Sequence, residues 1–453
     1  MAVAAPAQAD RLEDRLFFWK KSETKKKVDD NRAPRQSFIA AGQSLEPMLG
    51  VHTVDTLLGA IARYQIIVRR GGWPELPQGR ELAPGQKGVD VANLRYRLMA
   101  SGDLAAVRTD GDPAYFDAAL EQALKAFQSR HGIMAHGRLD ERTRAALNVP
   151  ATERLNTLNM NLVRAQEYLQ KPLGERYVVV NIPAAELETV ENGHVYSRHV
   201  NVVGKVDRPS PEVISQITEV NFNPYWHAPV SIVQKDILPL LREGNIGHLR
   251  DINLRVFADP EYSIEVDPST VNWATVSADQ YYFRQEPGEQ NAMATVRINF
   301  PNKHAVYLHD TPTKTLFNQA FRYDSSGCVR VDDVHVLTEW LLNGQDGWDR
   351  TRIDMVAASR ERLDVALERP VDFRMIYLTA WADMDGTVHF RPDIYNRDRP
   401  GAPAMAAHEP EVTGTVAVQQ QQIPASVSSV RESRPGDGFA DRMGNAIRSI
   451  IPQ

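Results

Sequence analysis

The stretch Tyr323-Asp-Ser-Ser-Gly-Cys-Val-Arg-Val331 contains the only cysteine of a 453-residue chain, and it follows a strand-like stretch, HAVYLHD, at residues 304–310. A single cysteine can form no disulfide within the chain and no cysteine-rich zinc site. Most lone cysteines are inert buried residues, so the count by itself does not indicate catalysis. A catalytic cysteine needs a thiolate, a nearby base and donors for an oxyanion, and the surrounding residues decide whether these are available.

The backbone beside Cys328 offers hydrogen-bond donors. Glycine adopts conformations that other residues resist, so the N–H groups of Gly327 and Cys328 are expected to point at one oxygen. A helix is predicted near residues 333–343, shortly after the cysteine. The positive end of its backbone dipole would favour a thiolate.

The base is expected to be a histidine, and the chain offers 12. His309 is favoured because it ends the predicted strand HAVYLHD and because loops at strand ends line functional sites. His304 is expected to start the same strand, and His335 to lie on the helix that follows the cysteine. Packing or solvent contact is the simpler interpretation of these two rivals, although spacing alone leaves the choice weak.

Together, YLHDTP at 307–312 and SSGCVRV at 325–331 resemble the YkuD-type L,D-transpeptidase domain, in particular its larger periplasmic, YcbB-like subgroup. The resemblance covers about residues 50–396. Many domains of this type read Ser-His-Gly-Cys, whereas Ser326 stands before the glycine here, so no role of that second histidine is carried over. The other stretches similar to the subgroup are NVVGKVDRPSP at 201–211, FNPYWHAPVSIVQKDILP at 222–239, FRQEPGEQNA at 283–292 and INFPNKHAVYLHDTP at 298–312.

The resemblance implies acyl transfer on peptidoglycan. Cys328 would attack the third residue, meso-diaminopimelate, of a tetrapeptide stem, releasing D-Ala and leaving a thioester. The side-chain amine of a second stem's diaminopimelate would resolve that thioester into a 3-3 cross-link. His309 would carry the protons, and backbone N–H groups near Gly327 and Cys328 would hold the oxyanion. A carbapenem is expected to acylate the same thiol, and no metal or organic cofactor is implied.

Two other functions remain open from the sequence. If water resolves the thioester, the same Cys328 and His309 pair gives an L,D-carboxypeptidase or an L,D-endopeptidase. A non-catalytic wall-binding scaffold is the third interpretation, and the intact pair argues against it. Acceptor choice depends on the shape of the cleft, which the sequence does not specify.

Two neighbours of the pair are candidates for orienting or substrate-binding roles. Tyr307 lies two residues before His309, so it is predicted on the same side of the strand, where it would orient the imidazole or pack in the core. Arg330 would bind a stem carboxylate through its two-pronged guanidinium. The alternative for Arg330 is a structural ion pair with Asp332 or Asp333.

The remaining candidates have weaker support. Ser326 belongs to the nucleophile loop and is assigned an orienting or substrate-binding role. Asn223, Tyr225 and Trp226 begin the predicted insertion and would form a wall of the donor groove. Aromatic residues in such a place are also common core residues, which is the alternative for Tyr225 and Trp226.

Residues 84–150 are predicted to form a small three-helix unit. Apolar residues recur at helical spacing in the stretches that contain Val91 and Leu120, and Asp140 is a good helix N-cap. The stretch ALKAFQSRHGIMAHGRLDERTRAALN at 123–148 resembles the peptidoglycan-binding module found beside cell-wall hydrolases. The resemblance implies wall binding, and the alternative is a structural spacer that has lost it.

The predicted fold class is α+β, with a β-rich YkuD-like catalytic domain, an inserted lid subdomain, an N-terminal helical region and the three-helix wall-binding module. From residue 176 the apolar pattern alternates, which is typical of strands. Helices are predicted at 230–241, with Pro239 at or near the end, and at 351–367; FRMIYLTAWAD and TVHFRPD are predicted to pair as a hairpin. The predicted segments are a flexible charged segment at 1–49, a helical region at 50–83, the module at 84–150, a helical connector at 151–175, the catalytic domain at 176–396 with the insertion at about 227–290, and a disordered tail with a short terminal amphipathic helix at 397–453.

Composition limits partners and compartment. The formal net charge of −6 does not suggest a nucleic-acid partner, and no apolar run is long enough to cross a bilayer. Ala7-Gln8-Ala9 fits a signal-peptidase site, although a basic leader and an apolar core do not precede it, so export to the periplasm is an expectation. The terminal amphipathic helix would touch a membrane surface or a protein partner, and the oligomeric state is left open.

Overall fold

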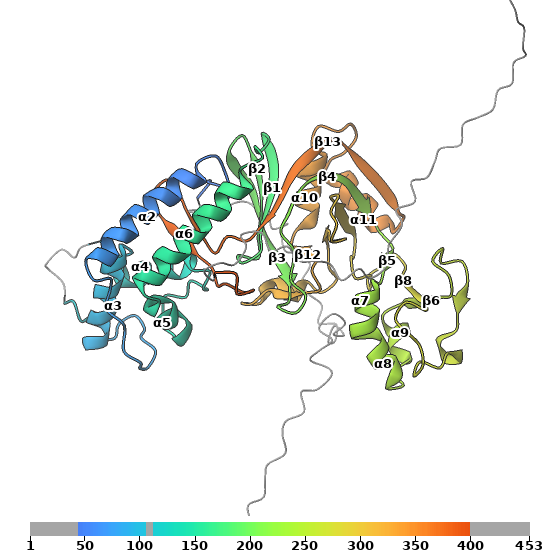
Figure 1. Cartoon of the computed structure of the whole chain (residues 1–453), viewed down its shortest axis with the longest axis horizontal. Helices are drawn as coiled ribbons and strands as arrows, with labels where there is room; N and C mark the ends of the chain where they lie inside the picture. The colour runs from blue at the N-terminus through green and yellow to red at the C-terminus, as the bar shows by residue number, and fades with distance from the viewer. Residues whose placement is uncertain (1–43, 106–111, 399–453) are drawn as a thin grey trace, which may run out of the picture. The chain divides into compact units, whose positions relative to one another are not determined.

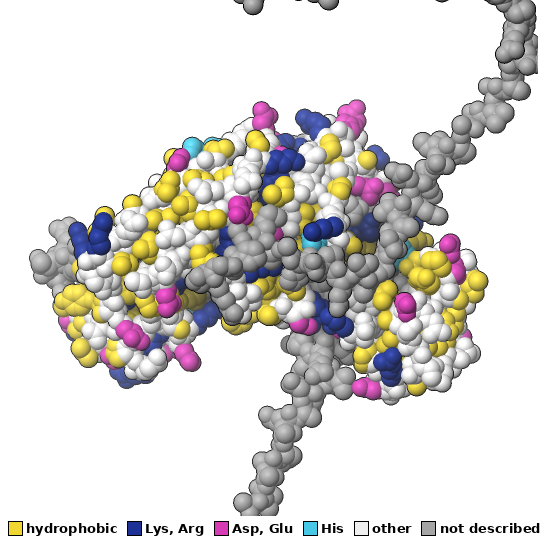
Figure 2. Space-filling view, in the orientation of Figure 1, with side chains coloured by type: hydrophobic (Ala, Val, Ile, Leu, Met, Phe, Trp, Pro, Cys, Tyr) yellow, Lys and Arg dark blue, Asp and Glu magenta, His cyan; other side chains and the backbone are white. Residues whose placement is uncertain are grey.

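The computed structural model describes residues 44–105 and 112–398 (Figure 1). The charged segment predicted at 1–49 and the tail predicted at 397–453 lie almost entirely outside the described residues. Within the described ranges, every helix is too short or too polar to span a bilayer. On the face drawn in Figure 2, basic and acidic side chains are interspersed.

Two long helices, α2 and α6, pack side by side near the N-terminus (Figure 1). Leu57 and Tyr64 of α2 share a core with Leu158 of α6 and with a C-terminal hairpin. The segment predicted as a connector at 151–175 is therefore largely a packed helix. The elements are α2 (Thr53–Arg69), α6 (Ala151–Tyr168), β14 (Ala380–Ala382) and β15 (Val388–Phe390).

Three helices form the small module between α2 and α6, and they share one apolar core. The side chain of Asp117 accepts a hydrogen bond from the Leu120 N–H, and Asp140 accepts one from the Thr143 N–H. These two N-caps fix where the second and third helices begin. The helices are α3 (Val89–Ser101), α4 (Ala118–Arg130) and α5 (Glu141–Asn148).

A nine-stranded sheet forms the larger β-rich part, and β2 also pairs with β3, so the sheet curls back on itself. The strand order is β11-β3-β12-β10-β9-β4-β13-β1-β2. The run RYVVVN in β1 is buried on both faces, which explains its continuous apolar character. The bounds are β1 (Arg176–Asn181), β2 (Glu186–Glu191), β3 (His194–Gly204), β4 (Val213–Phe222), β9 (Val296–Asn299), β10 (Leu308–His309), β11 (Tyr323–Ser325), β12 (Val329–Val331) and β13 (Leu363–Ile376).

Two helices cover one face of this sheet, α10 (Val334–Leu342) and α11 (Arg350–Ser359), and a one-turn 3₁₀ helix, η3 (Lys314–Asn318), joins β10 to β11. Leu337, Leu341 and Ile353 of the helices are buried with Leu308 and Val329 of the sheet. Residues next to Leu308 and Val329 in sequence must therefore face the other side of the sheet.

The insertion is a small subdomain with its own four-stranded sheet and its own apolar core. Its sheet order is β5-β8-β6-β7. Trp226, Leu254 and Phe283 lie in that core. The elements are β5 (Trp226–His227), α7 (Val230–Ile232), η1 (Val233–Ile237), α8 (Leu238–Arg242), α9 (Gly247–Asp251), β6 (Leu254–Phe257), β7 (Glu265–Val266), η2 (Pro268–Thr270) and β8 (Tyr282–Gln285).

Of three local predictions, one was confirmed, one was wrong and one was confirmed in part. Residues 230–242 form one helical run, α7, η1 and α8, so the helix predicted at 230–241 is confirmed. Pro239 lies three residues before the end of this run, directly after the π-helical turn η1, where the wider turn interrupts the regular ladder in which a proline ring would clash. The helix predicted at 351–367 ends at Ser359, and residues 363–376 form β13, which is paired on both edges by β4 and β1. Of FRMIYLTAWAD, only Ala380–Ala382 pairs with β15, because residues 373–376 belong to β13.

Candidate active site

The register of two short strands brings the predicted nucleophile and base to one face of the sheet. β10 and β12 are parallel neighbours in which Leu308 pairs with Val329 and His309 with Arg330. The Val329 N–H donates to the Tyr307 carbonyl at 3.1 Å, which extends the pairing by one residue. Since side chains alternate along a strand, Tyr307 and His309 of one strand share a face of the sheet with Arg330 of the other. Cys328 lies directly across from Tyr307 on that face and is therefore a diagonal neighbour of His309.

The thiol of Cys328 is partly buried and protonated at neutral pH. Burial raises its pKa to about 11. Hydrogen bonds from the backbone and side chain of Tyr307 lower the pKa, but burial has the larger effect. The predicted helix does begin soon after the cysteine, at Val334, but β12 lies between them. A thiolate favoured by the helix end is therefore not the resting state.

The imidazole of His309 is held as one tautomer. Its Nδ1 lies 2.5 Å from the backbone carbonyl oxygen of Asp310, and a carbonyl can only accept, so Nδ1 carries the hydrogen. This leaves Nε2 as the acceptor. Burial and the charge of Arg330 lower the pKa of His309 to about 3. His309 is therefore a neutral base over the physiological range.

Two arginines flank His309 across the sheet. Arg330 of β12 is its partner on one side, and Arg297 of β9 is its partner on the other. Both are among the causes of the low His309 pKa, because a nearby positive charge disfavours protonation of the ring. Burial lowers the pKa of Arg330 to about 10, so its guanidinium remains charged.

Ser325 fixes the loop that carries the nucleophile. Its hydroxyl donates to the Cys328 carbonyl and accepts from the Gly327 N–H at 3.2 Å. Gly327 has a φ of +114°, a conformation that favours glycine. Of the two predicted oxyanion donors, the Gly327 N–H is thus engaged, whereas the Cys328 N–H donates to no group in the described part of the chain.

The β3–β4 loop supports the same nucleophile loop from outside. Ser210 donates from Oγ to the Gly327 carbonyl at 2.8 Å and accepts at the same atom from the Gly204 N–H at 2.9 Å. A side chain at Gly204 would meet the Arg208 carbonyl oxygen at 2.2 Å, so the close turn requires glycine. Sequence reasoning missed Ser210, and its only signal was its place in the stretch 201–211.

Arg208 of this loop joins the nucleophile loop to the insertion. Its Nη1 donates to Ser326 Oγ at 3.0 Å, and its two Nη atoms form a bidentate ion pair with Asp236 of η1 at 2.5 and 2.8 Å. Ser326 is thus linked through Arg208 to a π-helical turn, a feature frequent at functional sites. Neither Arg208 nor Asp236 was singled out from the sequence, because their partners are remote.

Tyr307 connects the pair to the core of the insertion. Its ring meets the His309 ring edge-on, with centroids 5.6 Å apart, and packs against the insertion core. The Trp226 side chain hydrogen-bonds to the Tyr307 hydroxyl, while burial and the neighbouring Cys328 raise the Tyr307 pKa. Trp226 is itself buried, so it supports Tyr307 from within the core.

Three sequence candidates lie in structural positions. Asn223 is buried, and its side-chain amide donates to the carbonyls of Val356 in α11 and Glu361 after it, which ties the start of the insertion to the end of α11. His335 lies on α10 as predicted and bonds to Asp354 and Thr295 rather than to Cys328. His304 lies in a turn before β10, so the prediction that it starts the strand was wrong.

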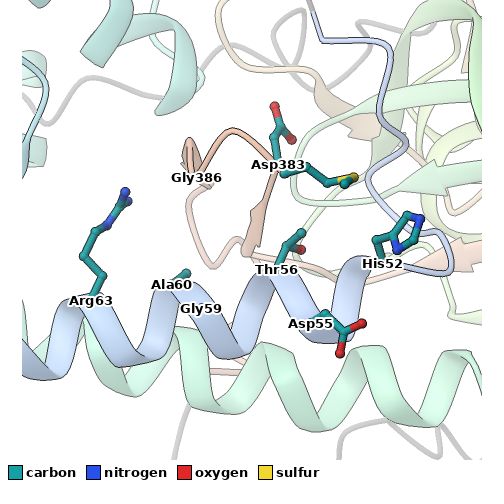
Figure 3. Close-up of a pocket in the computed structure, with 9 residues that line it drawn as sticks. His52, Asp55, Thr56, Gly59, Ala60, Arg63, Asp383 and Gly386 are labelled. Carbon is teal, nitrogen blue, oxygen red and sulfur yellow. The ribbon is translucent and has the colours of Figure 1, made fainter.

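A separate cavity of about 320 Å³ lies between α2 and the β14–β15 turn, away from the pair (Figure 3). Thr56 and Arg63 of α2 face Asp383 and Gly386 across it. In the described ranges, no three His, Cys, Asp or Glu side chains are grouped to hold a metal ion.

Comparison with known families agrees with this geometry. The YkuD family, described as "L,D-transpeptidase catalytic domain", matches residues 175–354. A "Putative peptidoglycan binding domain" matches residues 87–147, the range of α3 to α5. The chain carries a YkuD L,D-transpeptidase domain. Both Cys328 and His309 lie inside the matched range of this transpeptidase domain.

Individual similar proteins match the chain over part of its length. A "Putative L,D-transpeptidase" of Haemophilus influenzae is 31% identical over 252 residues, which are 55% of this chain and 50% of that protein. The match thus spans half of the relative's length. L,D-transpeptidase structures from Xylanimonas cellulosilytica and Stackebrandtia nassauensis are each 14% identical; they cover 66% and 67% of this chain and 100% and 96% of their own, with TM-scores of 0.21 and 0.25, too low to add to the argument.

Proposed function

We propose that this protein forms 3-3 cross-links in peptidoglycan through a thioester on Cys328, with release of D-Ala. The observation that carries the proposal is the β10–β12 register, which sets Cys328 and a neutral His309 on one face. The matched peptidoglycan-binding domain supports a wall substrate. A wall substrate in turn supports action in the periplasm.

The resting pair is a thiol and a neutral imidazole, so the proton moves during the attack. As the sulfur of Cys328 attacks the carbonyl of the third stem residue, its proton passes to Nε2 of His309, while Nδ1–H stays bonded to the Asp310 carbonyl. Protonated His309 is a strong acid, because burial and nearby arginines disfavour its charge. It therefore readily protonates the leaving amine of D-Ala.

The second half of the reaction reverses the proton path. Neutral His309 takes the proton from the acceptor amine as that amine attacks the thioester, and the thiol of Cys328 is restored. Such acid–base help contributes about 10²–10⁴-fold to the rate. The free Cys328 N–H is one oxyanion donor, and the Tyr307 hydroxyl, which hydrogen-bonds to Cys328, is a second donor within reach.

The test is incubation of the full chain with a disaccharide-tetrapeptide, followed by mass spectrometry of the products. Cross-linked dimer and free D-Ala support the proposal. Tripeptide without dimer would show a carboxypeptidase. Cleavage of a cross-linked dimer would show an endopeptidase, and unchanged substrate would show a non-catalytic scaffold. The Cys328→Ala chain, incubated in parallel, is expected to form none of these products.

A further inference from the structure

Three arginines gather around His227, Arg284 from the insertion, Arg297 from β9 and Arg362 from the loop before β13. Arg284 and Arg362 each place a guanidinium carbon 4.5 Å from the ring centre of Tyr225. Arg284 is also the cross-strand partner of His227, whose ring lies 6.2 Å from that of Tyr225. Residues from β5, β8 and the loop before β13 thus meet at one place.

Arg297 joins this group to the catalytic pair. Its guanidinium carbon lies 5.4 Å from the ring centre of Tyr307, and its backbone pairs with His309. Burial and then the charges of Arg284, Arg297 and Arg362 lower the pKa of His227 to about 4, as expected when three cations surround one ring. The cationic strip therefore runs from His309 to the base of the insertion.

The strip carries more positive charge than its carboxylate partners neutralise. Arg284 bonds to Glu286 at 2.7 Å, but Glu286 is shared with Arg255. Arg362 has only Asp364, at 3.5 Å.

Arg297 donates to the neutral oxygen of Asn221 at 3.0 Å, and no carboxylate of the described residues lies within ion-pair distance of it. The Arg362 side chain is 45% exposed, so an incoming ligand can reach it.

We propose that Arg284, Arg297 and Arg362 form a subsite that binds a free carboxylate of a wall stem peptide. A single guanidinium binds a planar carboxylate with two parallel hydrogen bonds, and neighbouring guanidiniums add to the attraction. The subsite rests on the proposed function, since it lies one strand from His309 and its ligand is part of the donor or acceptor stem. Two free carboxylates of a donor stem flank the attacked carbonyl and are the candidates proposed for the subsite, that of the terminal D-Ala and that of the diaminopimelate side chain.

Binding is measured by calorimetry on the full chain carrying Cys328→Ala, so that no turnover is needed. Three disaccharide-tetrapeptides serve as ligands: one with both carboxylates free, one amidated at D-Ala, and one amidated at the diaminopimelate side chain. We expect Arg362→Gln to weaken binding of the free ligand by about threefold to tenfold, and Arg362→Lys to weaken it less. Amidation of the bound carboxylate should remove this difference and so identify which carboxylate occupies the subsite.

Arg360→Gln is the matched control, because Arg360 belongs to the same loop but pairs with Glu289. Equal affinity of all variants for all ligands would overturn the subsite, as would equal losses for the free and both amidated ligands. Failure of the proposed function looks different: the subsite variants would still change affinity while the chain with Cys328 formed no product.

Discussion

The two members of the catalytic pair are held in different ways. His309 is fixed by its own strand and by the carbonyl of the next residue, Asp310. Cys328 depends on residues far away in the sequence, since the loop before it is bonded to Ser210 and Arg208, more than a hundred positions earlier. A short motif can place a base, whereas the nucleophile needs the assembled fold. Substitutions around His309 and substitutions around Cys328 should therefore reduce activity in different ways.

The largest effect is expected from removing the attacking atom. Cys328→Ala should lower acyl transfer by about 10⁴-fold or more, because no other described residue supplies a thiol. The measurement is D-Ala release from a tetrapeptide donor. Binding to isolated wall sacculi is the control and should be unchanged; D-Ala release at the original rate would contradict the assignment of the nucleophile.

His309→Gln comes next and removes the proton acceptor without changing the loop. We expect kcat/KM to fall by about 10²–10⁴-fold, with Cys328 still open to alkylation by iodoacetamide. His335→Gln is the matched control, because His335 bonds to Asp354 and Thr295 instead. Equal losses for the two histidine variants would show that His309 has only a structural role.

The pH profile follows from the two pKa values. The reactive form needs a neutral His309, whose pKa is about 3, and a thiol whose pKa is about 11. Acylation should therefore lose rate only as the pH falls toward 3, when the ring becomes protonated, and stay level from about pH 5 to pH 9. A rate that falls below pH 7 in a single-proton step would instead show that the pKa of His309 is ordinary and would contradict this prediction.

A smaller loss of activity is expected from removing the Ser325 hydroxyl, which holds the loop before Cys328. Ser325→Ala leaves the Gly327 N–H and the Cys328 carbonyl without their partner, which costs about 1–3 kcal/mol when such groups are buried. We expect kcat to fall by about tenfold to a hundredfold. Ser326→Ala is the control, since it loses only the bond from Arg208 and should cost less.

The smallest effect tests the link between insertion and loop. Arg208→Gln and Asp236→Asn should each lower kcat/KM, and the double variant should lose little more, giving a coupling of about 1 kcal/mol. The exposed pair of Arg255 and Glu265, also in the insertion, is the control and should show little coupling in kcat/KM. Fully additive losses for Arg208 and Asp236 would mean that the ion pair does not act as a unit.

The difference between a residue placed by a short motif and one placed by the assembled fold also explains which site residues the sequence could predict. Cys328 and His309 stand in short motifs, so their types and strand positions were visible locally. The roles of Ser210, Arg208 and Asp236 depend on which loops meet in space, which no local pattern reveals. The Gly327 N–H was expected to face substrate, but it donates to the Ser325 hydroxyl instead.

The fold shows the same limit. The helical module and most strands followed from periodicity and from the resemblance. The stretch 363–367, LDVAL, was assigned to a helix, yet it forms the first part of β13, where residues 363–366 pair with β4. Tertiary pairing outweighed local preference there.

The most direct test of the catalytic pair is the mass of the chain after brief mixing with a tetrapeptide donor and no acceptor. We predict an added tripeptide acyl group, mapped by digestion to Cys328, together with one D-Ala released per chain. In the His309→Gln chain the same adduct should form at least about a hundredfold more slowly. An adduct on another residue, or D-Ala release from the Cys328→Ala chain, would contradict the account.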